Sequence, residues 1–141
     1  MLVKRLLIAS FVLIAVIAVL HILALEHDWY FLYRWLDFIV HLLGGAWIIV
    51  SIFWITFKTE SHFERGVEAE YAFIALLSVL IISIGWELFE IWIGNTSLTV
   101  PHYWNDTISD LTADVVGGAI AYILVLRAKQ RSTSLFPNSH K

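Results

Sequence analysis

The chain has 141 residues, of which 60% are hydrophobic, and it carries a formal net charge of −3. Soluble domains are closer to half apolar, and here the excess collects in long runs, which indicates an integral membrane protein. The negative net charge gives no support for a nucleic-acid partner, and we expect none. The chain has no cysteine, which excludes disulfides, thiolate metal sites and thiol nucleophiles.

Four apolar segments are long enough to cross a bilayer, because a membrane-spanning helix needs about 20 mostly apolar residues. They cover residues 6–25, 36–57, 71–93 and 107–126. We therefore predict an all-α fold, with a single four-helix membrane domain over residues 1–126 and a loose polar cytoplasmic tail over 127–141. Lys4 and Arg5 precede the first segment, so a signal peptide is the alternative there. The length of the apolar run and the lack of a small-x-small cleavage site favour a span.

The basic residues predict the orientation of these spans, because cytoplasmic loops carry most Lys and Arg. Of the nine basic residues, all except Arg34 lie before the first span, between the second and third, or after the fourth. We therefore expect a bacterial inner-membrane protein with both termini in the cytoplasm. The loops 26–35 and 94–106 would then lie outside, and their aromatic residues are typical of a membrane interface. The short inner loop, 58–70, predicts that the second and third spans are antiparallel neighbours.

A set of ionisable residues lies within or beside the last three spans, where such residues are costly and usually mark a functional site. They are Asp37, His41, Glu87, Glu90, Asp106, Asp110 and Asp114. Spacings of three or four residues place each group on one helix face, and a rise of about 1.5 Å per residue gives them overlapping depths. The pairs Gly44-Gly45 and Gly117-Gly118 continue two of these faces and predict close helix packing. We expect one outward-facing acidic pocket inside the bundle.

The carboxylates in this pocket cannot all be ionised together, since Arg34 is the one fixed cation expected nearby. Some acids are protonated, or the pocket is wet, or a cation binds there. Carboxylates with imidazole suit Mg²⁺, Mn²⁺, Zn²⁺ or iron. On the metal hypothesis the ligands are His41, Glu87, Asp110 and Asp114, and Asp106 and His21 are additional candidates. Glu90 would be the general base, and Asp37 would orient His41.

The leading functional hypothesis is a metal-dependent hydrolase or transferase that acts on a phosphate ester of a membrane lipid or an envelope precursor. One alternative is a small proton- or cation-coupled transporter, although the inner halves of the spans carry few polar residues. Another is a non-enzymatic envelope or antibiotic-tolerance factor whose polar cluster only holds the helices together. A homo-oligomer is compatible with so small a bundle.

Three sequence pieces carry a family resemblance. They are Asp37-x-x-x-His41-x-x-Gly44, then Trp86-Glu87-Leu88-Phe89-Glu90-Ile91-Trp92, and then Trp104-x-Asp106-Thr107-x-x-Asp110 followed by Gly117-Gly118. This pattern resembles the YjdF-like bacterial inner-membrane proteins and is similar to that of the VanZ-like family. The resemblance implies a polytopic envelope protein, and VanZ-like proteins are associated with low-level glycopeptide resistance. The chain lacks the Gln-x-x-x-Pro-x-Arg stretch of that family and has Asp114 where Asn is common, which argues against a resistance role.

Overall fold

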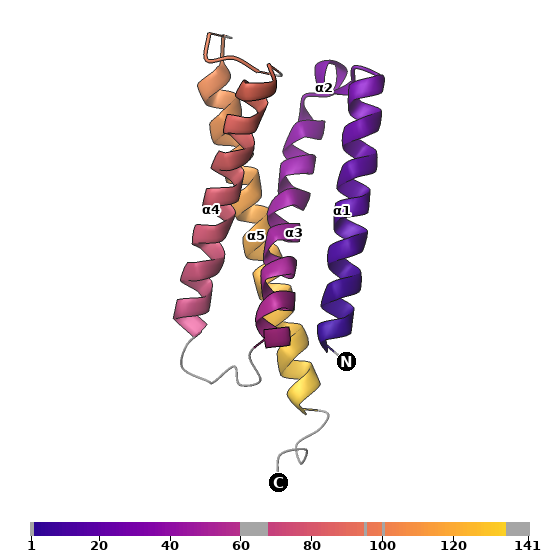
Figure 1. Cartoon of the computed structure of the whole chain (residues 1–141), viewed down its shortest axis with the longest axis vertical. Coiled ribbons are helices and arrows are strands. Elements are labelled where there is room, and N and C mark those ends of the chain that lie inside the picture. The colour runs from indigo at the N-terminus through magenta and orange to yellow at the C-terminus, as the bar shows by residue number, and fades with distance from the viewer. Residues whose placement is uncertain (1, 60–67, 95, 100, 135–141) are drawn as a thin grey trace.

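The protein is a bundle of long antiparallel helices, seen in a computed structural model that describes residues 2–59, 68–94, 96–99 and 101–134. The helices are α1 (Leu2–Glu26), α2 (Trp29–Leu32), α3 (Trp35–Thr59), α4 (Glu68–Ile93) and α5 (Tyr103–Ser134). No strand occurs in these residues, which confirms the predicted all-α fold. Figure 1 shows both termini at one end of the bundle, here called the terminal end. The short helix α2 and the α4–α5 connection lie at the other, here called the α2 end.

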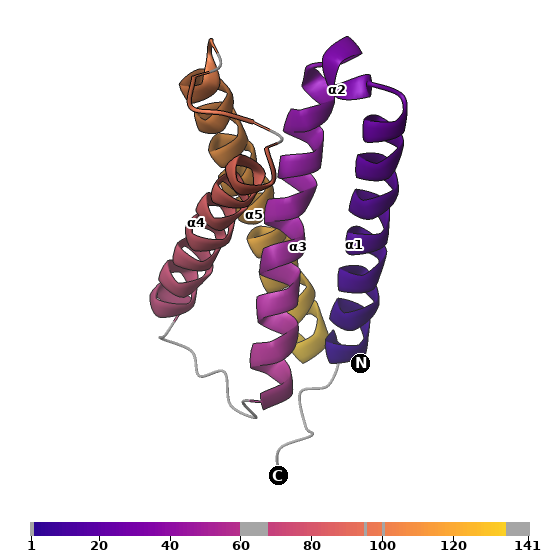
Figure 2. The same cartoon turned by 45° about the horizontal axis from the view of Figure 1, so that its top comes forward.

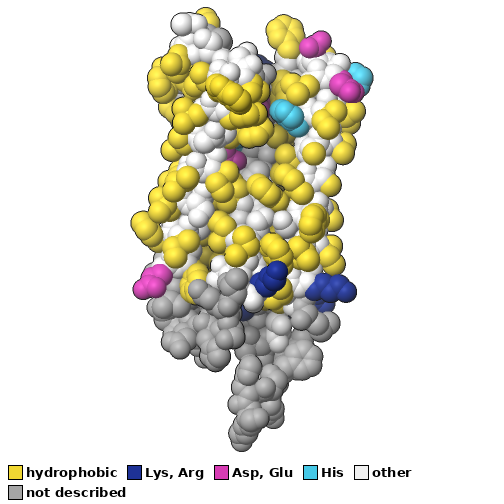
Figure 3. All heavy atoms as spheres, in the orientation of Figure 1, with side chains coloured by type: hydrophobic (Ala, Val, Ile, Leu, Met, Phe, Trp, Pro, Cys, Tyr) yellow, Lys and Arg dark blue, Asp and Glu magenta, His cyan; other side chains and the backbone are white. Residues whose placement is uncertain are grey.

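Four of these helices, all except α2, are long and apolar enough to cross a membrane. Their outward surfaces carry large hydrophobic side chains, such as Phe11, Phe73 and Ile81, each more than 60% exposed. Figure 3 shows hydrophobic side chains over most of the length of the visible face. A surface of this kind is stable against lipid, whereas in water it would be an aggregation site. The described structure therefore supports a membrane-embedded bundle.

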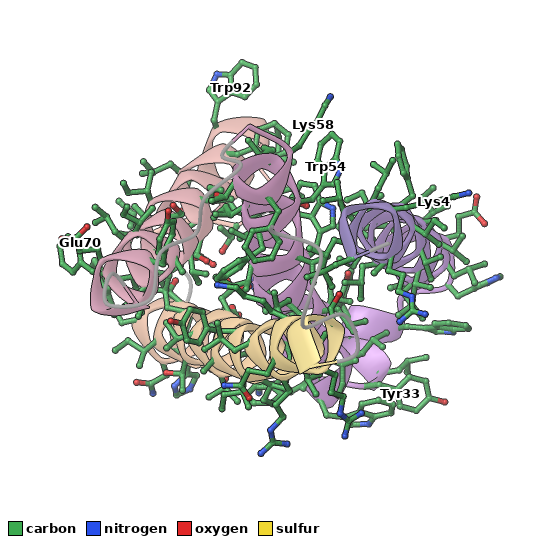
Figure 4. All side chains as sticks on the ribbon, turned by 90° about the horizontal axis from the view of Figure 1, so that it is seen from below. Lys4, Tyr33, Trp54, Lys58, Glu70 and Trp92 are labelled. Carbon is green, nitrogen blue, oxygen red and sulfur yellow. The ribbon has the colours of Figure 1, made fainter. Side chains whose placement is uncertain are left out.

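Helix α3 is the centre of the bundle. It packs most extensively against α5 and then against α1, while α4 packs mainly against α5 and less against α3. Figures 1, 2 and 4 show α1 and α4 on opposite sides of α3. The expected neighbours α3 and α4 do touch, but α5 is the main partner of both. The predicted inner loop, 58–70, lies largely outside the described residues.

The close contact between α3 and α5 depends on glycine, as predicted. A Cβ atom on Gly45 would overlap the backbone of Asp114, and one on Gly117 would overlap the carbonyl oxygen of Leu42. Small residues at such positions let two membrane helices approach until their backbones nearly touch. This contact places the middle of α3 directly against the first half of α5.

The interior is divided by polarity along the bundle axis. Toward the terminal end, the buried core is apolar and includes Ile49, Phe53, Val79 and Val125. Toward the α2 end, the buried residues include the polar set His41, Ser83, Glu87, Asp110 and Asp114 beside apolar residues such as Leu36 and Ala113. A continuous polar path through the bundle is therefore interrupted by packed hydrocarbon side chains in the described residues.

The helices run past the predicted spans at most of their ends. Helix α5 continues to Ser134, so the expectation of a loose tail is wrong for residues 127–134. Arg, Ala, Lys and Gln in this stretch are good helix formers, and a helix need not end where the apolar run ends. The rest of the predicted tail, 135–141, lies outside the described residues. The short helix α2 was not expected, since its four residues are fewer than a sequence pattern can reveal.

Candidate metal and headgroup site

The site is organised around an imidazole–carboxylate pair that joins α3 to α5. His41 Nδ1 lies 3.0 Å from Asp114 Oδ2, and both side chains are buried. Because a carboxylate can only accept, this hydrogen bond places the imidazole proton on Nδ1. Gly44 makes room for it, since a Cβ there would lie 3.2 Å from Asp114 Oδ1. A neutral His41 then presents the lone pair of Nε2 on its other side.

Two more carboxylates lie near His41. Its Nε2 lies 3.9 Å from Asp37 Oδ1, one helical turn earlier in α3. Asp37, His41 and Asp110 each offer one ligand atom, and these three atoms lie within 4.8 Å of one another. Protein ligands bind metal ions at about 2.0–2.6 Å, so atoms sharing one ion are separated by at most about 5 Å. The three groups can therefore bind a single cation.

Asp37 and Asp110 also line a cavity at the α2 end, here called the acidic pocket. Its volume is about 270 Å³, and no Lys or Arg is among the described residues that line it. The acidic residues in its wall are Asp28, Asp37, Glu87, Glu90, Asp106 and Asp110. Carboxylates gathered in a wall that has no lysine or arginine favour a bound cation, bound protons or water.

Glu87 reaches this pocket from α4 and is buried. Its Oε2 accepts a hydrogen bond of 2.8 Å from the hydroxyl of Thr107 on α5. Its Oε1 is buried without a hydrogen-bond partner among the described residues. A buried carboxylate oxygen with no donor is costly, which indicates that this wall of the pocket is complementary to a cation or a proton donor.

The remaining predicted residues occupy different positions around the pocket. Glu90 lines it, and Asp106 lines it as an exposed side chain near its mouth. His21 does not line the acidic pocket, and its Nδ1 lies 2.8 Å from the hydroxyl of Tyr30 on α2. The predicted single pocket is in fact two cavities, because His41 and Asp114 line a second one.

That second cavity, here called the lateral cavity, lies between α1 and α4 beside α3. Its volume is about 140 Å³, and apolar side chains such as Ile14, Ile17 and Ile82 make up most of its wall. The polar exceptions are the His41–Asp114 pair, Ser83 and the indoles of Trp47 and Trp86. The imidazole of His41 thus lies at the boundary between the lateral cavity and the acidic pocket.

Tyr30 is a site residue that sequence reasoning placed only in an interfacial aromatic belt. Helix α2 carries Tyr30, and the residue lies in the wall of the acidic pocket. Burial raises the pKa of its hydroxyl above the ordinary value, and the carboxylates of Asp37 and Glu90 raise it further. The position of Thr107 beside Glu87 and that of Trp47 in the wall of the lateral cavity were likewise not predicted. No periodic pattern distinguishes these side chains, since their role depends on which element faces them.

Comparison with known families places the chain in one of them. A family model described as "Predicted membrane protein (DUF2238)" matches residues 5–131. The chain belongs to this family. The match covers nearly the whole bundle, including every candidate site residue, and supports a membrane protein. No curated protein and no solved structure matches the chain.

Proposed function

We propose that the chain is a metal-dependent enzyme that cleaves or transfers a phosphate ester on a membrane lipid or a lipid-linked envelope precursor. The observation that carries this proposal is the environment of His41. Asp114 holds one ring nitrogen, and Asp37 and Asp110 offer ligand atoms beside the ring. Imidazole with carboxylates suits Zn²⁺, Mn²⁺ or Fe²⁺, and Mg²⁺ is favoured less because it prefers oxygen ligands and water.

The proposed roles differ from those expected from sequence for two aspartates. Asp37 becomes a ligand together with His41 and Asp110, and Asp114 becomes the residue that positions His41. A carboxylate on the second nitrogen of a ligating histidine fixes its tautomer and raises its basicity, and Asp114 meets this description. Glu87 stays a candidate fourth ligand, because its unpartnered Oε1 lies in the wall of the same pocket.

A cation at this position would polarise a phosphoryl oxygen and lower the pKa of a water molecule. Glu90, in the same wall, is proposed to take the proton of the attacking water. The new P–O bond forms as the ester P–O bond breaks, and the departing alkoxide takes a proton from solvent at the pocket mouth. Tyr30 keeps its proton under these conditions, so it is suited to donate a hydrogen bond to a phosphoryl oxygen.

The proposed location is the bacterial cytoplasmic membrane, with both termini in the cytoplasm and the acidic pocket facing outward. The two termini lie at one end of the bundle, and the pocket lies at the other. The basic residues Lys4, Arg5 and Lys58 are at the terminal end, as the positive-inside rule requires for this orientation. The resemblance to YjdF-like inner-membrane proteins agrees with it.

Elemental analysis of the purified full-length chain tests the proposal. We expect close to one Zn, Mn or Fe ion per chain after metal loading and removal of loose ions. Asp37→Asn and Asp110→Asn should each lower the retained metal at least tenfold. Glu26→Gln is the matched control, because Glu26 is an exposed acid that does not line the pocket.

Activity provides the second half of this test. Release of phosphate or of a headgroup from phospholipids in proteoliposomes should require the metal and should be lost in Glu90→Gln, while that variant keeps its metal. Absence of stoichiometric metal in the wild-type chain would overturn the proposal. Equal metal retention by Asp110→Asn and Glu26→Gln would overturn it as well.

A further inference from the structure

The lateral cavity contains polar atoms that the fold leaves without partners. Ser83 is only 3% exposed, and its Oγ has no hydrogen-bond partner among the described residues. The indole Nε1 of Trp47 is also buried without one, on the same criterion. Both residues line this cavity, Trp47 from α3 and Ser83 from α4. In a bilayer, where water is scarce, two residues with unpartnered polar atoms in the wall of one largely apolar cavity indicate a ligand that supplies the partner.

The chemistry of these two atoms specifies that partner. An indole N–H can only donate, and a serine hydroxyl can donate as well as accept. The ligand must therefore bring an acceptor oxygen into an apolar cavity. The side chains of His41 and Asp114 bond each other, and apart from them and Trp86 the rest of the wall, including Ile14, Ile17 and Ile82, is mainly hydrocarbon. An acceptor oxygen attached to a hydrocarbon chain meets both requirements, and an acyl ester is such a group.

The position of the cavity relative to the acidic pocket agrees with a lipid. Trp47 follows His41 by six residues, which is about 9 Å along a helix and directed away from the α2 end. A lipid whose headgroup lay beside His41 and Asp37 would place its ester linkage deeper in the bundle, toward Trp47 and Ser83. Its chain would continue along α1 and α4.

We infer that the lateral cavity binds an ester-linked acyl chain of a membrane lipid, whose carbonyl oxygen accepts hydrogen bonds from Trp47 Nε1 and Ser83 Oγ. The hydrocarbon part of the chain lies against Ile14, Ile17 and Ile82. This inference deepens the proposed function and rests on it for the role of the lipid as substrate. Binding of the lipid itself requires no metal.

A comparison of ester and ether lipids tests the inference. The delipidated full-length chain in detergent is titrated with diacyl phosphatidylglycerol and with its dialkyl ether analogue of equal chain length. Bound lipid is counted by native mass spectrometry. An ether lacks the carbonyl oxygen, so the wild-type chain should bind the ester lipid about tenfold to a hundredfold more tightly, for two lost hydrogen bonds. Equal binding of the two lipids by the wild-type chain overturns the inference.

Variants of Trp47 and Ser83 then test whether these two residues cause the preference for the ester lipid. Trp47→Phe and Ser83→Ala should each weaken ester-lipid binding about threefold to tenfold and leave ether-lipid binding nearly unchanged. Trp92→Phe is the control for the first, because Trp92 is 81% exposed and points away from the bundle (Figure 4). Ser78→Ala is the control for the second, because the Ser78 hydroxyl is satisfied by the carbonyl oxygen of Ile74. An ester preference that survives in both Trp47→Phe and Ser83→Ala contradicts the inference.

The experiments can contradict the proposed lipid site and the proposed metal site independently of each other. Asp110→Asn and chelator-treated wild-type protein should retain the full preference for the ester lipid. If that preference is present while no metal binds, the proposed enzyme is wrong and the lipid site stands. If metal binds with one ion per chain while ester and ether lipids bind equally, the lipid site is wrong and the metal site stands.

Discussion

His41 and Asp114 form a buried pair across the tightest helix contact of the bundle, with 3.0 Å between His41 Nδ1 and Asp114 Oδ2. The pair depends on the glycines around it, since Gly45 brings α3 against the backbone of Asp114 itself. The same contact that packs the bundle therefore fixes the tautomer of the imidazole. Stability and metal affinity should be linked through these residues.

Replacing Asp114 should affect metal affinity more than metal stoichiometry. Asp114→Ala removes the acceptor for His41 Nδ1 and should lower metal affinity about 10–100-fold, while saturating metal still gives the wild-type stoichiometry. The buried N–H left without a partner should also cost about 1–3 kcal/mol of stability. Asp114→Asn keeps an acceptor oxygen and should lose less on both measures. Metal titration beside thermal unfolding measures both quantities. Unchanged affinity in Asp114→Ala would show that Asp114 does not position His41.

Gly45→Ala should destabilise the bundle strongly. The added Cβ would overlap the backbone of Asp114, and backbone cannot move aside as a flexible side chain can. We expect a loss of about 1–3 kcal/mol or more. Gly85→Ala in α4 is the matched control, because a Cβ there meets nothing within 4 Å. That control should be neutral or gain up to about 1 kcal/mol through helix propensity. Thermal unfolding followed by tryptophan fluorescence measures both, and similar losses in both variants would argue against close α3–α5 packing.

Thr107 should hold Glu87 through its hydroxyl and not through its shape. Thr107→Val removes the 2.8 Å hydrogen bond to Glu87 Oε2 while keeping the side-chain volume. The expected loss is about 1–3 kcal/mol of stability, because it leaves a buried carboxylate oxygen without this donor. Thr107→Ser retains the hydroxyl and should recover most of that loss. Denaturation of the three proteins side by side is the measurement, and a Ser variant no more stable than the Val variant would contradict the assigned role.

Tyr30 should make the protein less stable at alkaline pH. Its pKa is raised in the folded chain from an ordinary value of 10.0, first by burial and then by Asp37 and Glu90. Folding therefore favours the neutral phenol. Its contribution to stability is complete below the unfolded pKa and is lost as the pH rises toward the higher folded pKa. Between about pH 9 and pH 11.5 the wild-type chain should lose more stability than Tyr30→Phe. Equal losses in thermal unfolding across that range would be evidence against a raised pKa.

Much of the fold follows from the sequence, because a bilayer imposes simple constraints. An apolar run long enough to cross hydrocarbon must satisfy its backbone internally, and a helix does so without help from other segments. The four long helices α1, α3, α4 and α5 follow from this reasoning. The glycine pairs predicted close helix packing, but not that α3 and α5 would pack on each other. The helical spacing of Asp37 and His41 also placed them on one face correctly. The helical continuation to Ser134 and the short helix α2 did not follow, since neither depends on an apolar run.

What the sequence by itself determined is therefore the chemistry of the site residues, their helix faces and their approximate depth, because these depend only on residue type and helical rise. What only the tertiary structure decided is the partner of each side chain. It pairs His41 with Asp114 and brings Asp37 and Asp110 close to the same imidazole. It also places Thr107 where its hydroxyl donates a hydrogen bond to Glu87, and it divides the expected pocket into an acidic and an apolar cavity. Which side chains meet depends on how each helix is rotated and at what angle it crosses its neighbour. Packing over the whole helix interface sets that geometry, and the spacing of residues along one helix does not predict it.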